Sequence, residues 1–401
     1  MVTRRLPSSR YGVLPQFVFA RLGHHLCTGI LVPLLPLLRQ DFALTYFQSG
    51  LLTTAFAVAY GFGQLPVVAL SGKVGQRTLI IVGLIGMSTA AIGAGLARDY
   101  NQLLALRVLM GLFGSGYHAL SSSFLSHSFS KERRGQILGL HIVGGNFSSL
   151  IAPLVAVLLA SLSGSWRIPF ILLALPALVA GLVVWARVPA TGAAQRGEVR
   201  DFVQGASGWR GIVRRIGLLL MLDFLLSLVA FSMYSFFPLY LTDKHGVSFA
   251  QAGVLTGIMV GVGIIGSPLG GGISDRLGRQ RVILMAVISA GPLFYLLTAA
   301  PMGLWFLGAL AAFGIVVSLH MPAMESLMAD HVPAAHLAMA LAVYYFFSQE
   351  TSSVMTAVVG RLTDLHGLGR VFQSLALFAC VVSAVALGKM WGFGRPSSDV
   401  H

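Results

Sequence analysis

Long apolar runs separated by short polar loops fill almost the whole chain. A membrane-spanning helix needs about 20 consecutive, mainly apolar residues, and twelve runs reach that length. They cover residues 13–38, 47–71, 78–97, 102–125, 136–160, 167–186, 216–241, 250–273, 282–300, 303–326, 337–360 and 371–393. The pattern predicts an all-α integral membrane protein with twelve transmembrane helices.

One polar interval, 187–215, is much longer than the others and is rich in arginine. It separates the first six apolar runs from the last six. We therefore expect residues 1–190 and 215–401 to form two six-helix bundles, joined by a cytoplasmic linker over 191–214.

An internal repeat supports this division. Residues 48–52 (QSGLL) correspond to residues 251–255 (QAGVL) at an offset of 203, and the same offset places Gly75 on Gly278. A direct repeat of two six-helix halves is typical of pseudo-symmetric transporter folds. The repeat therefore predicts that the two bundles share one internal design.

Composition and charge agree with a lipid environment. Of 401 residues, 56% are hydrophobic and 10% are charged, whereas soluble domains carry about 25% charged residues. The net charge of +14 lies mainly in loops on one side of the expected membrane. This bias predicts cytoplasmic termini and a multi-pass protein of a bacterial-type inner membrane, and it argues against a nucleic-acid partner. Arg361 and Arg370 fall on the opposite side and weaken the bias in the second half without reversing it.

The loop after the eighth run carries the most specific motif. Its sequence over 271–281 is GGISDRLGRQR, which resembles the G-x-x-x-D-R-x-G-R signature of the major facilitator superfamily. The matching positions are Gly271, Asp275, Arg276, Gly278 and Arg279. In that family the loop acts as a gating latch between the halves. A simpler interpretation is a short basic loop that only sets the topology.

Two further stretches resemble members of the same superfamily. Arg107 and Gly111 match an R-x-x-x-G motif, while Gly144, Gly145 and Pro153 depart from the pattern of proton-driven drug exporters. Together with the opening run, they look most like the fosmidomycin-resistance-like branch of exporters. The resemblance implies a secondary active transporter of a small organic solute or drug that works by alternating access, with proton-coupled export as the leading expectation.

Ionisable residues inside the expected spans are the candidates for function, because an arginine there costs about 2.5 kcal/mol or more. In the first half they are basic. Arg21, His24 or His25, and Thr28 recur at helical spacing and form one polar stripe, which we expect to face a cavity rather than lipid. Arg107, His118 and His141 lie in other spans of the same half.

The second half carries acids in its spans. Glu350 lies nearest the expected midplane, where such transporters place substrate and coupling ions, so it is the leading candidate for proton coupling. A permanent ion pair with Arg21 or Arg107 is the alternative. For Asp223, a structural and a coupling role are equally compatible with the sequence. Glu325 falls in the last turn of its predicted helix, where it could be simply solvated.

Aromatic, amide and imidazole side chains in the spans could complete the substrate cavity. These residues are Gln64, Asn146, Tyr234, His320, Tyr344, Tyr345 and Gln349. Hydrogen bonds between helices are the simpler role for each of them.

The histidines also raise the possibility of a metal site. His24 and His25 are adjacent, however, and adjacent side chains on a helix point about 100° apart. We therefore expect them not to share one ion, and we expect no metal or other cofactor. The two cysteines, Cys27 and Cys380, form no metal-binding motif.

Several functional alternatives stay open. The chain could instead take up an organic anion or a metal ion, or it could be a sensor derived from a transporter. We expect no enzyme, because motifs such as G-x-S-x-G and H-E-x-x-H do not occur in the sequence. The expected partners are a small-molecule substrate, protons and the lipid bilayer, with the protein acting as a monomer.

Overall fold

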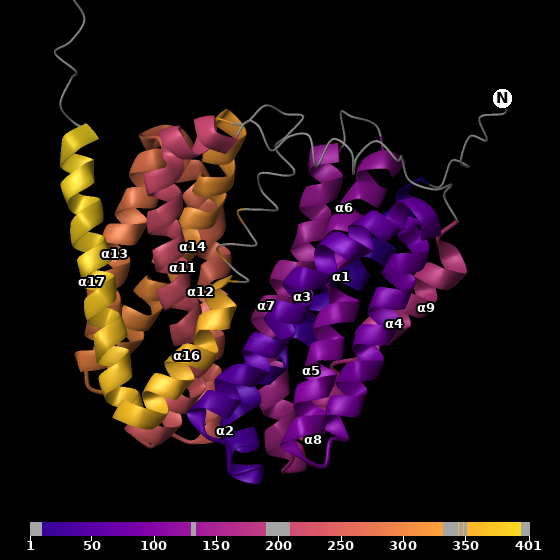
Figure 1. Ribbon diagram of the computed structural model, residues 1–401, viewed down its shortest axis with the longest axis horizontal. Helices are drawn as coiled ribbons and strands as arrows, with labels where there is room; N and C mark the ends of the chain where they lie inside the picture. Colours follow the sequence, from indigo (N-terminus) through magenta and orange to yellow (C-terminus); the bar gives the residue numbers. More distant parts are fainter. Residues whose placement is uncertain are drawn as a thin grey trace, which may run out of the picture. The chain divides into compact units, whose positions relative to one another are not determined.

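The computed structural model describes residues 10–129, 134–189, 209–331, 344, 348 and 351–393 (Figure 1). The described residues are nearly all helical, and no strand occurs among them. Contacts group the chain into two units. The first comprises Met1–Leu44 and Leu51–Arg200, and the second comprises Thr45–Gly50 and Asp201–His401.

The first unit consists of short and long helices in sequence. They are η1 (Arg10–Val13), α1 (Leu14–Gly29), α2 (Leu31–Asp41), α3 (Tyr46–Val74), α4 (Gln76–Gly95), α5 (Tyr100–Gly114), α6 (Tyr117–Ser128), α7 (Arg134–Ser163), α8 (Arg167–Leu172) and α9 (Leu175–Arg187). The first residues of α3, up to Gly50, group with the second unit. Its core includes Phe17, Ile80, Leu84, Tyr117 and Phe124, which lie on α1, α4 and α6.

The second unit contains longer uninterrupted helices. They are α11 (Trp209–His245), α12 (Phe249–Leu277), α13 (Arg279–Ala299), α14 (Leu304–His331), α16 (Thr351–His366) and α17 (Leu368–Phe393). Because α11 begins at Trp209, its first turns occupy the end of the segment that the sequence assigned to the linker, 191–214. Residues 191–208 of that linker lie outside the described residues.

Nine stretches of the described residues are long and apolar enough to cross a membrane. Three of them join consecutive short helices: α1 with α2, α5 with α6, and α8 with α9. The other expected spans correspond to α3 and α12, which have 29 residues each, and to the partly described 337–360. At 1.5 Å per residue, α3 and α12 are each about 43 Å long, which is enough to cross a bilayer.

The internal repeat has a clear structural counterpart. Helices α3 and α12 begin and end at positions related by the 203-residue offset. Each begins with a capping box, in which Thr45 pairs with Gln48 in one copy and Ser248 pairs with Gln251 in the other. Each ends at a glycine with left-handed φ, +91° at Gly75 and +92° at Gly278. The same local chemistry therefore starts and stops both helices.

Small residues allow close helix packing in the second unit. A Cβ atom built on Gly270 would lie 2.3 Å from the carbonyl oxygen of Leu319, and one on Gly266 would lie 2.7 Å from that of Ile315. Both carbonyls belong to α14. This small-residue spacing is typical of tightly packed membrane helices, and it brings α12 into extensive contact with α14.

Candidate substrate and coupling sites

The break between α5 and α6 shapes the main polar site of the first unit. Helix α5 ends at Gly114, and α6 begins at Tyr117 after two intervening residues. The Gly114 carbonyl oxygen lies 3.2 Å from Nε2 of His24, which is buried in α1. The His24 ring also stacks on Tyr117, with centroids 4.8 Å apart. The break therefore holds His24 through both a hydrogen bond and an aromatic contact.

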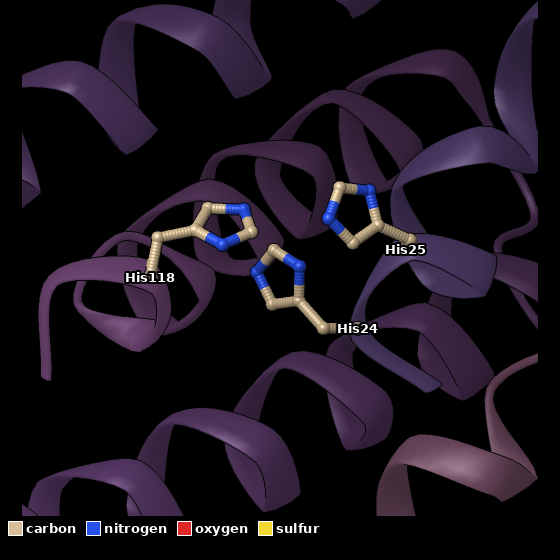
Figure 2. Close-up of side chains that lie close together, drawn as sticks. All are labelled: His24, His25 and His118. Atoms are coloured by element: carbon tan, nitrogen blue, oxygen red, sulfur yellow. The ribbon is translucent and has the colours of Figure 1, made fainter. Parts of the chain in front are cut away.

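Three imidazole rings meet beside this break (Figure 2). The ring centroids are 5.5 Å apart for His24 and His25, 4.9 Å for His24 and His118, and 5.0 Å for His25 and His118. One nitrogen from each ring lies within 4.8 Å of the others. His24 and His25 therefore lie in one cluster, although their adjacency in the sequence led us to expect that they would not share one ion. Side-chain rotation offsets the angular separation of their Cα–Cβ bonds.

Arg21 lies beside this histidine cluster, which we define as His24, His25 and His118. A Cβ atom built on Gly145 of α7 would be 2.8 Å from Nε of Arg21 and 2.9 Å from Nε2 of His25. The two polar groups therefore occupy the space left free by the missing side chain. The described acids of the first unit, Asp41 and Asp99, lie at helix ends, so positive and imidazole groups dominate the interior.

Two other members of the predicted cavity have local partners. Nε2 of His141, which is fully buried, lies 3.2 Å from the Ser121 hydroxyl oxygen. The Thr28 hydroxyl donates to the backbone carbonyl of His25 at 3.0 Å, a bond within the helix. Sequence reasoning overlooked Ser121 and Tyr117. The only signal for them was a polar and aromatic sequence around His118.

The buried guanidinium group of Arg107 interacts mainly with residues of α3. Its Nε donates to the carbonyl oxygen of Leu52 at 3.2 Å, and its guanidinium carbon lies 4.5 Å from the centroid of the Phe56 ring. A cation over an aromatic face is favourable in a desolvated site. These contacts link α5 to α3, so this arginine holds two helices together.

The second unit contains a buried acid–base pair. Nε2 of His320 in α14 lies 3.2 Å from a carboxylate oxygen of Asp223 in α11, and both side chains are almost completely buried. The sequence marked both residues individually, but their pairing depends on how α11 packs against α14, which spacing along the chain does not encode.

Among the other predicted residues, those that the structure describes lie on different helices. Glu325 is partly buried, and α14 continues to His331, so this acid does not occupy the last turn as expected. Tyr234 is partly buried beside Phe231, and Gln64 is partly buried in α3. Tyr345, Gln349 and Glu350 lie outside the described residues, as do the side chains of Asn146 and Gly271.

The loop between α12 and α13 is held to α14 by one of its arginines. Asp275 and Arg276 are exposed, and α13 has Gly278 as its N-cap without a side-chain cap. Asp275 therefore does not cap α13. Arg279 instead pairs with Asp330 and donates to the backbone carbonyl of Ser326, both in α14.

Comparisons with known proteins agree on one family. The sequence model of the Major Facilitator Superfamily matches residues 17–357. The Fosmidomycin resistance protein of Escherichia coli (strain K12) is 24% identical, over 91% of this chain and 90% of the relative. An MFS-type efflux pump of Mycolicibacterium smegmatis is 26% identical, over 83% and 82% of the two chains.

Another relative and two solved structures extend the comparison. The probable sulfoacetate transporter SauU of Cupriavidus necator is 26% identical, over 67% of this chain and 66% of the relative. A bacterial homolog of the human lysosomal transporter Spinster, in an inward-facing and occupied conformation, has a TM-score of 0.83 and 16% identity and covers 98% of this chain and 100% of its own. A D-xylose–proton symporter has a TM-score of 0.77 and 18% identity, covering 97% and 98%. These two structures support the fold.

Proposed function

Because this chain belongs to the major facilitator superfamily, a family of small-solute transporters and not of enzymes, we propose that it exports a small organic anion in exchange for protons. The observation that carries the proton coupling is the buried pair of Asp223 and His320, 3.2 Å apart. Ionisable groups deep within membrane spans are expensive and typically serve ion or proton movement. This pair can hold a proton on the imidazole or release it.

The positive interior of the first unit supports an anionic substrate. Arg21 and the histidine cluster lie together, and the described acids of that unit are at helix ends. A guanidinium can bind a carboxylate, sulfonate or phosphate through charge-assisted hydrogen bonds. Similarity to a probable sulfoacetate transporter is in keeping with such a substrate. Similarity to a fosmidomycin resistance protein and an efflux pump favours export, and the bacterial relatives favour an inner-membrane location.

Reconstituted protein tests the coupling. Proteoliposomes with an internal pH dye receive sulfoacetate or fosmidomycin as probes, together with an imposed pH gradient. Transport of the accepted probe should dissipate the gradient in the unaltered protein. Asp223→Asn should still exchange labelled probe across the membrane, but without proton movement, because a neutral amide no longer stabilises the proton on the His320 imidazole.

A matched control separates coupling from general damage. His331→Gln changes another α14 histidine, whose ring bonds to the Leu327 backbone, and should leave proton movement unchanged. Proton flux of normal size in Asp223→Asn would remove this acid from the mechanism. Glu350→Gln tests the other acid proposed from the sequence in the same assay. Absence of probe exchange with every organic anion would contradict the anion proposal.

A further inference from the structure

The histidine cluster has the arrangement of a metal site. Three rings from α1 and α6 present one nitrogen each within 4.8 Å of one another. His24 approaches the Gly114 carbonyl through Nε2 at 3.2 Å, so this nitrogen carries the hydrogen. Its Nδ1 therefore keeps a lone pair for a ligand bond. A backbone carbonyl that fixes the tautomer in this way is the usual support of a metal-binding histidine.

Unpaired lone pairs in the cluster provide a second observation. Nδ1 of His24 and Nε2 of His25 are buried and have no hydrogen-bond partner among the described residues. The His24 side chain as a whole is only 1% exposed. Burying a polar atom without a partner costs free energy, and a metal ion that accepted these lone pairs would remove that cost.

We propose that His24, His25 and His118 bind a borderline divalent transition-metal ion such as Zn²⁺ and leave one coordination position open. Imidazole nitrogens are preferred ligands of such ions. Zn–N bonds of about 2.0–2.1 Å place tetrahedral ligand nitrogens about 3.4 Å apart. The present separations, up to 4.8 Å, close by rotation of His25 and His118, which are only partly buried and so have room to move.

Charge determines what fills the open position. Three neutral imidazoles leave the full charge of the ion uncompensated. His141 lies on the α7 side and contributes no negative charge. A buried excess of positive charge is unfavourable, so the fourth ligand is an anion. The anion as fourth ligand rests on the proposed function, whereas the three-histidine site does not.

Cobalt(II) substitution tests the site directly. Tag-free, full-length protein in detergent is titrated with Co²⁺, which absorbs visible light strongly in tetrahedral sites. The unaltered protein should bind one ion per chain, and Zn²⁺ should displace it. His25→Gln and His118→Gln should each weaken binding at least tenfold, since even the loss of a residue that supports a ligand costs about 10–100-fold. Thermal unfolding without metal identifies which variants are folded.

A matched control and an anion probe complete the design. His331→Gln, a histidine outside the cluster, should bind Co²⁺ like the unaltered protein. Thiocyanate should shift the visible bands by entering the open position. The metal site would be overturned if the unaltered protein bound neither Co²⁺ nor Zn²⁺, or if both folded cluster variants kept the unaltered affinity. The open position would be overturned if thiocyanate left the spectrum of bound Co²⁺ unchanged. These measurements need neither substrate nor gradient, so failed transport and failed metal binding are distinguishable.

Discussion

At the scale of single residues, two adjacent glycines of α7 face different surroundings. A Cβ atom on Gly144 would lie 2.4 Å from the backbone oxygen of Val18, whereas one on Gly145 would meet the side-chain ends of Arg21 and His25. Backbone atoms of a packed helix cannot move aside as easily as the ends of side chains can. We expect Gly144→Ala to destabilise the protein by about 1–3 kcal/mol through overpacking, measured as a lower melting temperature in detergent.

Gly145→Ala should behave differently. The added methyl group displaces Arg21 and His25, so we expect near-normal melting but about tenfold weaker substrate binding, because a lost charge-assisted hydrogen bond is worth about 1.5–3 kcal/mol. The two variants differ by one position and the same methyl group, which makes each the control of the other. Equal melting temperatures for both would contradict the packing argument.

Arg21 itself should control substrate affinity. If its guanidinium binds the anion, Arg21→Gln should weaken apparent affinity by about 10–100-fold, the equivalent of about 1.5–3 kcal/mol for a hydrogen bond to a charged group. Arg98→Gln, at an exposed position between α4 and α5, removes the same charge and should have little effect. Concentration-dependent uptake of labelled substrate into proteoliposomes measures both, and a similar loss in both variants would exclude a specific role for Arg21.

The sequence predicted the residues of these sites better than their partners. Its polar stripe put Arg21 on one side of α1 with either His24 or His25, because helical spacing brings such positions together, but it did not predict that both rings belong to one cluster. It did not predict that His118 completes a three-ring cluster or that His320 meets Asp223. Those meetings depend on a helix break and on helix packing, which bring together positions 94 residues apart in the first case and 97 in the second.

At the scale of helices, Gly278 controls the turn between α12 and α13. Its φ of +92° and ψ of +135° lie in a region that residues with a Cβ atom adopt at a cost of about 1–3 kcal/mol. Gly278→Ala should therefore lower the melting temperature. Gly272→Ala adds the same methyl group in open space within α12 and should be neutral or slightly stabilising, because alanine favours helix. A reversed order of melting temperatures would contradict this account.

The repeat explains which helical features could be predicted. Glycine and capping residues act locally, so the 203-residue offset in sequence carries over to equal bounds for α3 and α12. Interruptions inside apolar runs were harder to predict. The run 13–38 divides at Ile30 and the run 102–125 at Ser115–Gly116, although hydropathy continues across both. Hydropathy indicates whether a segment is surrounded by lipid or by water. Whether its helix is interrupted depends on packing against neighbouring helices.

At the scale of the whole molecule, the repeat conserves helix ends but not buried chemistry. Helices α3 and α12 have the same kind of cap and end at the same kind of glycine. The first unit nevertheless has an arginine–histidine interior, whereas the second has a buried acid–base pair. Proteins that share one fold can act on many different substrates. The function therefore has to be argued from these side chains, and we expect substrate affinity and proton coupling to respond to changes in different units.

The direction of transport gives the last prediction. Respiring everted membrane vesicles have an acidic interior that corresponds to the outside of the cell. An exporter that exchanges substrate for protons should accumulate the labelled anion inside them, because protons leaving the vesicle drive its entry. Asp223→Asn should abolish this accumulation, and so should an ionophore that collapses the pH gradient. A proton symporter for uptake would instead concentrate the anion in right-side-out vesicles, and that result would replace export with import.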